Sequence, residues 1–265
     1  MSEAASAAPL LNVRQLEVVY HDVATAIQGV SIEVAPGSIV AMIGSNGAGK
    51  TTTLRAVSGF LPAEDVAVTD GEILFAGQSL RGLLPHQISR RGVVLVPERE
   101  KLFHTLTVRE NLDFSVTSRR YAIRNSVFDY FPRLAERQKQ VAGYLSGGEK
   151  QMLAIGMALV CEPKLLLIDE LSLGLAPIVT NEIMEILRTI NQSLGLTMLI
   201  VEQNVAAALR IASFGYVLEN GRVVFKGEAD RLLSHQDMRE FYLGDGRTGS
   251  YRNIRQYTRK RRWWG

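Results

Sequence analysis

Short apolar runs recur along the 265-residue chain and predict the buried strands of an α/β domain. Four of these runs contain mostly branched or other apolar residues with no polar alternation. They span residues 38–44, 92–97, 164–169 and 197–201. This pattern is typical of parallel strands whose two faces are both covered. We therefore expect a largely parallel sheet packed between other layers.

A periodic apolar pattern between the last two runs predicts an amphipathic helix. Its stripe consists of residues at three- and four-residue spacing: Ile183, Ile186, Leu187 and Ile190. Such a stripe is the buried face of a helix that packs on a sheet. Gly195 stands where this helix is expected to end.

A hairpin and a helical segment complete the predicted elements. Residues 216–225 form two apolar stretches around Asn220-Gly221, the dipeptide that favours a tight hairpin turn. Residues 103–145 carry helix signals and no clear strand, and Thr107 with Glu110 resembles a capping box. We expect an α/β domain with a mostly helical insertion and a C-terminal tail.

Composition places the chain among ordinary soluble domains. It is 46% hydrophobic and 22% charged. The single cysteine, Cys161, excludes an intramolecular disulfide and fits a reducing compartment. Residues 1–10 lack the basic start and apolar core of a signal peptide. The longest mostly apolar stretch, residues 151–161, is too short to cross a bilayer, so we expect no membrane span.

The positive charge of the chain is concentrated in its tail. Residues 245–265 carry seven Arg and Lys against Asp245, a net +6, so the total of +3 leaves −3 for the rest. A basic tail is weak support for a nucleic-acid face, and we expect no nucleic-acid partner. The tail also has two tryptophans, so it could contact anionic lipid. We favour the alternative of a solvated terminus.

The stretch GSNGAGKTT, residues 44–52, predicts a phosphate-binding loop. It follows a predicted strand and precedes a helical run, so backbone N–H groups and a helix N-terminus are available to an anion. Lys50 is expected to reach the β- and γ-phosphates, and the Thr51 hydroxyl to bind Mg²⁺. The nucleotide-binding residues expected here are Gly44, Ser45, Asn46, Gly47, Ala48, Gly49, Lys50, Thr51 and Thr52.

A pair of acids follows the strand-like run LLLIDE, residues 165–170. Asp169 is expected to hold Mg²⁺, and Glu170 to deprotonate the attacking water. A helix N-cap is the ordinary interpretation of acids at this place. The position of the pair, about 120 residues after the phosphate loop, favours the catalytic interpretation.

The stretch YLSGGEKQ, residues 144–151, predicts a second anion-binding helix start. Ser146 and Glu149 form a capping box. Two adjacent glycines, Gly147 and Gly148, destabilise a helix start unless a ligand must approach closely. One chain thus has two phosphate-binding helix ends. We infer that each ATP lies between the phosphate loop of one subunit and this stretch of another.

Together these three motifs resemble the ATP-binding subunit of ATP-binding-cassette (ABC) transporters, over residues 10–244. The resemblance implies a P-loop NTPase (RecA-like) core, an antiparallel β subdomain and a helical insertion at about residues 100–160 that carries the signature motif. It also implies a head-to-tail dimer that closes on two ATPs. On this basis Tyr20 stacks on adenine, although an ordinary strand aromatic is the alternative. Glu98 contacts Mg²⁺ and the attacking water. Ser146, Gly147 and Gly148 contact the γ-phosphate held by the partner subunit.

Departures from the usual family pattern narrow the resemblance. They are Glu149 for the usual glutamine, Leu171 for proline, Ala176 for aspartate and Gln203 for the switch histidine. The stretches VPE, SGGE, SLGLAP and VEQN together resemble the LivF-type subunit of branched-chain amino-acid importers, with urea or short-amide importers as the alternative. Leu171 departs even from that subgroup, and the loss of proline is expected to loosen the backbone after Glu170.

The stretch LIVEQN, residues 199–204, ends a predicted strand with three polar residues. Gln203 is predicted to face the site, where it can sense the γ-phosphate and orient water but cannot take up a proton. Glu202 is expected to face away or to cap the next helix. Asn204 is expected to be the N-cap of that helix.

The function implied by the resemblance is that of an ATP-hydrolysing motor subunit, peripheral on the cytoplasmic face of the inner membrane. Its expected partners are a second ABC subunit, the permease subunits and, indirectly, a solute-binding protein. We expect a heterodimer, with a homodimer of the isolated subunit as the alternative. One alternative is a soluble ABC ATPase that acts in translation or DNA repair. Another is a degenerate regulatory subunit that binds ATP without cleaving it; the missing histidine favours this, and the intact Lys50, Asp169 and Glu170 oppose it.

Overall fold

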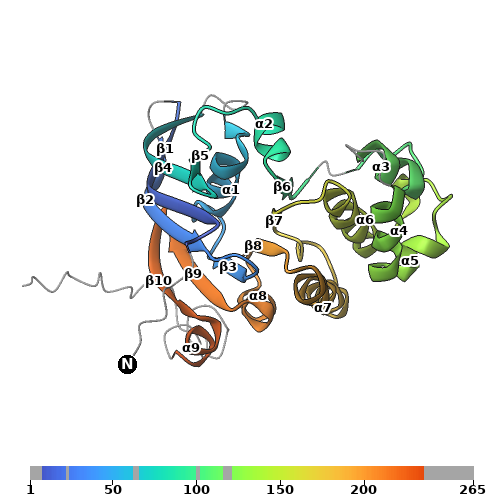
Figure 1. Ribbon diagram of the computed structural model, residues 1–265. Helices are drawn as coiled ribbons and strands as arrows, with labels where there is room; N and C mark the ends of the chain where they lie inside the picture. Colours follow the sequence, from blue (N-terminus) through green and yellow to red (C-terminus); the bar gives the residue numbers. More distant parts are fainter. Residues whose placement is uncertain (1–7, 22–23, 62–65, 100–101, 116–120, 236–265) are drawn as a thin grey trace, which may run out of the picture.

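A computed structural model describes residues 8–21, 24–61, 66–99, 102–115 and 121–235 of the protein. Two β-sheets and a group of helices form the described part of the chain (Figure 1). The tail at residues 245–265, for which lipid contact and a solvated terminus were the two expectations, lies outside the described residues.

The larger sheet has six strands in the order β10-β9-β3-β8-β7-β6. Their bounds are β3 (Ile39–Ile43), β6 (Val93–Val96), β7 (Leu165–Asp169), β8 (Thr197–Glu202), β9 (Phe214–Glu219) and β10 (Arg222–Glu228). All neighbouring pairs are parallel except β9 and β10. The four predicted strands are confirmed, each within one residue at either end. The hairpin is confirmed too: Asn220 and Gly221 have φ of 48° and 73°, as a tight turn with two left-handed residues requires.

The smaller sheet is antiparallel and has the order β2-β1-β4-β5. Its strands are β1 (Leu11–Tyr20), β2 (Ala24–Val34), β4 (Val66–Phe75) and β5 (Gln78–Ser79). This sheet is the antiparallel subdomain that the resemblance implied. Its inner face packs on the six-stranded sheet, so it covers one side of the strands that lead into the site.

Helices fill the remaining layers. They are α1 (Lys50–Ser58), α2 (Pro85–Arg90), α3 (Val108–Ser115), α4 (Tyr121–Tyr130), α5 (Pro132–Glu136), the 3₁₀ turn η2 (Ala142–Tyr144), α6 (Gly147–Leu159), α7 (Pro177–Leu194), α8 (Val205–Ile211) and α9 (Ala229–Ser234). The helical insertion is confirmed, and α3 to α6 lie together at one end of the molecule, on the right in Figure 1. Its capping box is also confirmed: the Thr107 N–H donates to Glu110 Oε2 at 2.7 Å.

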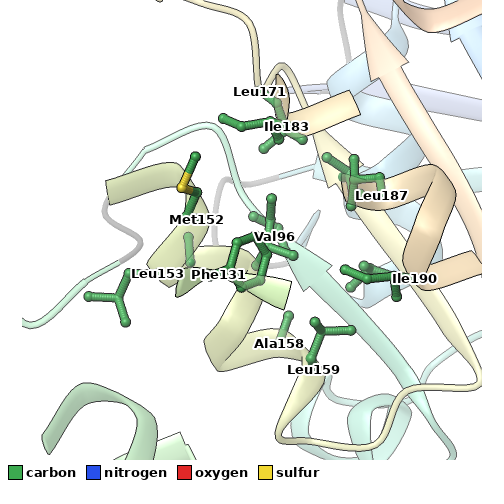
Figure 2. Packing of buried hydrophobic residues seen from close by; sticks show 14 of the residues in the cluster. Val96, Phe131, Met152, Leu153, Ala158, Leu159, Leu171, Ile183, Leu187 and Ile190 are labelled. Carbon is green, nitrogen blue, oxygen red and sulfur yellow. The ribbon is translucent and has the colours of Figure 1, made fainter. Parts of the chain in front are cut away.

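Alternate residues of the parallel strands enter two different cores, because successive side chains of a strand point to opposite faces. Leu166, Ile168 and Ile200 pack among α6 and α7, in the cluster seen in Figure 2. Leu165 and Leu167 join the cluster that contains α1 and the antiparallel sheet. The sheet is therefore buried on both faces, and its polar chemistry is confined to the ends of the strands.

Three of the four residues of the predicted α7 stripe are buried against this sheet, and the fourth, Ile186, is partly buried. Ile183, Leu187 and Ile190 are at most 1% exposed, and Figure 2 places them on the side of α7 that faces β6 and α6. The helix ends at Gly195, whose φ of 63° is the left-handed C-cap conformation that glycine adopts most easily. Local periodicity was thus sufficient to locate this helix and its buried face.

Candidate nucleotide-binding site

The strand order brings three predicted motifs to one edge of the sheet. Strand β8 lies between β3, which leads into the phosphate loop, and β7, which ends at Asp169. The register pairs Ile43 with Glu202 and Asp169 with Val201. Because carboxyl ends of parallel strands share an edge, the phosphate loop, the acid pair and Gln203 all lie there.

The phosphate loop depends on two of its glycines for steric reasons. Gly49 is the N-cap of α1 and has a left-handed backbone with φ 98°. A Cβ on Gly44 would lie 2.3 Å from the carbonyl oxygen of Leu218 on β9. Side chains at these positions would push the loop away from its neighbours. The loop runs directly into α1, whose N-terminal N–H groups favour an anion.

Lys50 is buried and has three oxygen partners. Its Nζ donates to the carbonyls of Gly44 at 2.9 Å and Ser45 at 3.0 Å. The same atom lies 3.1 Å from Oε1 of Glu170. The structure therefore brings the lysine predicted to bind phosphate and the predicted base into direct contact.

Thr51 and Asp169, the two residues predicted to bind Mg²⁺, also lie in contact. Thr51 Oγ1 donates to Asp169 Oδ1 at 3.1 Å. The pKa of Asp169 is raised to about 6, chiefly by burial. The charges of Glu170 and Glu98 add to this rise, whereas the Thr51 hydrogen bond and the charge of Arg55 oppose it. Negative charge therefore gathers at this point, which is the environment of a cation site.

The donor set fits Mg²⁺ bound together with a nucleotide. Among the described residues, no three or more His, Cys, Asp or Glu side chains form a metal cluster. Mg²⁺ in nucleotide sites needs no such cluster, because one or two carboxylates, substrate phosphates and waters complete its octahedron. Asp169 and the hydroxyl of Thr51 supply the hard oxygen ligands that this arrangement requires.

Tyr20 and Glu98 approach the same site from other elements. The Tyr20 hydroxyl, at the end of β1, is 3.2 Å from Oγ1 of Thr52 in α1. Glu98 follows β6 and pairs with Arg99 at 3.0 Å. Its charge acts on Asp169, so it lies within electrostatic range of the predicted cation site. The antiparallel sheet and the loop after β6 thus both border the site.

The predicted capping box at the start of α6 is confirmed, and it has an additional partner. The N–H and Oγ of Ser146 donate to Glu149 Oε2 at 2.9 and 2.7 Å. Arg137, which follows α5, lies 2.7 Å from Glu149 Oε1. Burial alone would raise the pKa of Glu149, but the Ser146 bonds and the Arg137 charge together lower it. Glu149 therefore stays ionised and fixes the helix start.

One of the two signature glycines is required by packing within the chain. A Cβ on Gly148 would lie 2.5 Å from Cγ1 of Val179 on α7. At Gly147 the nearest atom is the flexible end of Leu175, at 3.1 Å. Close contact between α6 and α7 is therefore a second reason for glycine at position 148, beside the predicted approach of a ligand.

The residues after β8 differ in part from expectation. Asn204 is the N-cap of α8, and its Oδ1 accepts from the Ala207 N–H at 3.1 Å, as predicted. Glu202 does not cap that helix. It is fully buried, and its Oε1 accepts from the Ser172 N–H at 3.0 Å. Gln203 is exposed at the edge of the sheet where the site lies.

Comparison with known proteins identifies the family. The model for ABC transporter domains matches residues 27–172, over half of the chain. The chain belongs to the ABC transporter family. The resemblance seen in its motifs is thereby confirmed, and its enzymatic activity is the ATP hydrolysis of ABC ATP-binding subunits.

Curated relatives include transport ATP-binding proteins of several kinds. The high-affinity branched-chain amino acid transport ATP-binding protein BraG of Pseudomonas aeruginosa is 44% identical, over 85% of this chain and 96% of BraG. The probable branched-chain amino acid transport ATP-binding protein LivF of Archaeoglobus fulgidus is 35% identical, over 81% and 91%. The lipopolysaccharide export system ATP-binding protein LptB of Escherichia coli is 31% identical, over 83% and 91%.

Solved structures agree with the fold of this ABC protein. The ADP conformation of an ATP-binding cassette of an ABC transporter matches with a TM-score of 0.76 at 25% identity, over 89% of this chain and 99% of that one. The P-loop NTPase core is therefore confirmed. In the part of the chain that the structure describes, no helix has the length and apolar content of a membrane span.

Proposed function

We propose that this ABC protein is the ATP-hydrolysing motor subunit of a membrane importer for branched-chain amino acids. The observation that carries the proposal is its 44% identity to BraG over 96% of that protein's length. Identity to the lipopolysaccharide export protein LptB is 31%, so the chain is more similar to the branched-chain amino acid transport protein BraG than to LptB. The substitutions that set this chain apart from the wider family, Gln203 above all, support the same subgroup.

ATP would occupy the edge of the sheet where the motifs meet. Lys50 and the N–H groups of the phosphate loop would bind the β- and γ-phosphates. Thr51 and Asp169 would hold Mg²⁺, with Glu98 beside it. When bound, Mg²⁺ neutralises the charge of the phosphates. Tyr20 would stack on adenine, and its hydroxyl contact with Thr52 supports this location.

Glu170 would act as the general base that deprotonates the attacking water. Its carboxylate contacts the ammonium of Lys50 in the structure. The phosphate oxygens of bound ATP would compete for the same ammonium, so we expect ATP to displace Glu170 from Lys50. Gln203 would donate to the γ-phosphate and orient the water, but an amide cannot take up the proton. Glu170 is then the single base of the site.

Transport requires partner subunits that complete the site and that change conformation when ATP binds or is hydrolysed. Ser146, Gly147 and Gly148 would bind the γ-phosphate held by a second ABC subunit, and we propose a heterodimer. Binding of ATP would close the dimer and shift the permease subunits, and hydrolysis would reopen it. The solute would come from a separate binding protein, with this subunit peripheral at the cytoplasmic face of the membrane.

A reconstitution experiment tests the proposed substrate class. The full chain is purified with the subunits that associate with it and placed in liposomes with the solute-binding protein. We expect ATP-dependent uptake of leucine, isoleucine or valine. Uptake of urea or short amides alone would favour the alternative importer. Association with nucleic acid and with no membrane protein would favour a soluble ABC ATPase.

Substitution of Glu170 by glutamine tests the proposed base. The isosteric amide keeps the shape of the site but cannot accept a proton, so we expect kcat to fall by roughly 10²-fold or more while ATP binding persists. Turnover by the assembled complex and binding of a fluorescent ATP analogue measure the two effects separately. Unchanged turnover at this subunit's site would favour the degenerate regulatory subunit.

A further inference from the structure

The turn after Glu170 has a backbone that needs support from its neighbours. Glu170 has φ 44°, in the left-handed region that residues other than glycine rarely adopt. Its N–H donates to the carbonyl of Val201 on β8 at 2.9 Å. Such a conformation persists only where the surrounding structure holds it. The contacts of residues 170–172 therefore decide where the Glu170 carboxylate points.

Glu202, the last residue of β8, provides most of this support. Its Oε1 accepts from the Ser172 N–H at 3.0 Å, and its Oε2 accepts from the Ser172 hydroxyl. The N–H of Leu171 also acts on this carboxylate and lowers its pKa. Proline at position 171, usual in the family, has no N–H and could not act in this way. Glu202 thus holds the turn directly, through both donors of Ser172.

A second anchor holds the turn from the opposite side. Gln151 of α6 donates its Nε2 to the carbonyl of Leu171 at 3.0 Å. The side chain of Leu171 is 1% exposed and lies beside Ile183 in the cluster of Figure 2. The turn is therefore joined to the helix that begins at the signature motif and to the strand that leads to Gln203.

Burial makes the ionised form of Glu202 costly: it raises the pKa of this carboxyl group, and the hydrogen bonds from Ser172 oppose that rise. The side chain is fully buried, and among the described residues it forms no ion pair with Lys, Arg or His. Burial of a carboxylate costs far more than burial of an amide or a hydroxyl. A carboxylate, however, can accept from the N–H and the hydroxyl of Ser172 on separate oxygens. We infer that the site tolerates this cost because it fixes the geometry of the turn.

We propose that Glu202 is a positioning residue for ATP hydrolysis, which acts by holding residues 170–172 so that Glu170 faces the attacking water. The inference rests on the role of Glu170 proposed above. Ground-state binding of ATP uses the phosphate loop, whereas the position of Glu170 matters in the transition state. Loss of Glu202 should therefore lower kcat and leave KM for ATP nearly unchanged.

Four variants of the full-length chain, assembled with the subunits that co-purify with it, test the proposal. Glu202→Ala should lower kcat at least about tenfold, since small misplacements of a reacting group are costly. Glu202→Gln keeps the shape but has one acceptor oxygen instead of two, so it should recover only part of this loss. The fall in kcat caused by Ser172→Ala should lie between the falls caused by Glu202→Gln and Glu202→Ala. KM for ATP should stay within about twofold for all three.

Thr197→Val is the matched control, at the opposite end of β8. It removes one buried hydrogen bond, from the Gly37 N–H at 2.9 Å, far along the strand from Glu202. We expect its kcat to be unchanged. An equal fall of kcat in Thr197→Val and Glu202→Ala would attribute the effect to general stability and overturn the proposal.

The outcomes separate this inference from the proposed function. Wild-type kcat in Glu202→Ala, with Glu170→Gln inactive, overturns the role of Glu202 and leaves the proposed base intact. If Glu202→Ala does not fold, an unchanged kcat in Ser172→Ala overturns the role instead. Full activity of Glu170→Gln removes the proposed base on which the inference rests.

Discussion

At the scale of single residues, Asp169 illustrates how a functional site can oppose stability. Its carboxylate is buried beside Glu170 and Glu98, and its pKa is raised to about 6. A pKa above the value in the unfolded chain means that the folded chain binds the proton more tightly. Ionisation of Asp169 near neutral pH therefore destabilises the fold when no Mg²⁺ is present.

The sign of this effect gives a prediction for Asp169→Asn. Between pH 4 and 6 the wild-type free energy of unfolding, measured by urea in EDTA, should fall as pH rises, because only the unfolded chain releases the proton. At pH 7 the asparagine variant should be more stable by roughly 1–3 kcal/mol and should lack this slope. Its Mg²⁺-dependent ATP turnover should be lost. Lower stability of the variant at pH 7 would contradict the prediction.

Gln203 allows a second prediction at this scale. Loss of its hydrogen bond to a charged phosphate in Gln203→Ala should lower kcat by roughly tenfold or more. Gln203→His should retain turnover and add a pH dependence near 6.5, because imidazole titrates there and an amide does not. Profiles of kcat against pH measure both effects. Asn204→Ser, which keeps the helix cap, is the control and should behave as wild type.

At the scale of elements, the start of α6 combines two requirements in a few residues. Glu149, held by Arg137, caps the helix through Ser146. Gly148 lets α7 approach, since any side chain there would meet Val179. Gly147 faces outward and is exposed. The two adjacent glycines are therefore expected to differ in what they contribute to packing and to the partner's ATP.

Paired alanine substitutions separate these contributions. Gly148→Ala should lower the free energy of unfolding by about 1–3 kcal/mol through overpacking. The double variant with Val179→Ala should recover much of this loss, because it restores the space. Gly147→Ala should be close to neutral for stability and should lower ATP-driven association with the partner subunit. Urea unfolding and light scattering measure the two effects; equal destabilisation by both glycine variants would be contrary to this assignment.

At the scale of the whole molecule, the proposed nucleotide site joins the two sheets. Tyr20 belongs to the antiparallel sheet, whereas Lys50 and Asp169 follow strands of the parallel sheet. The helical insertion adds the signature motif at the start of α6, the helix whose Gln151 is bonded to the turn after Glu170. A ligand bound between the two sheets is expected to stabilise both at once, because it binds the folded chain and not the unfolded one.

Thermal unfolding with and without ligand tests this coupling. MgATP at 100 times its Kd should stabilise the chain by about 2.7 kcal/mol. For a chain of this size that corresponds to a rise in Tm of roughly 5–10 °C, in one shared transition. EDTA should remove much of the shift, and Lys50→Ala should abolish it. A shift confined to one of two separate transitions would show that the sheets are not coupled through the site.

Local patterns in the sequence suffice to predict the four parallel strands, the α7 stripe, the Asn220-Gly221 turn and the phosphate loop. Burial on two faces, helical periodicity and turn geometry each leave a signal within a few neighbouring residues. The same holds for the capping boxes at Thr107 and Ser146. The motifs, taken with their order, also predict the family and its ATPase activity.

Contacts between segments that are distant in the sequence could be identified only in the folded chain. Glu202 and Ser172 are 30 residues apart, and only the β7–β8 pairing brings them together. Gly148 meets Val179 through the packing of α6 on α7. A run of polar residues after a strand predicts a site edge but leaves the direction of each side chain open. Those directions follow from strand order and register, which arise from burial summed over the whole core and not from any local signal.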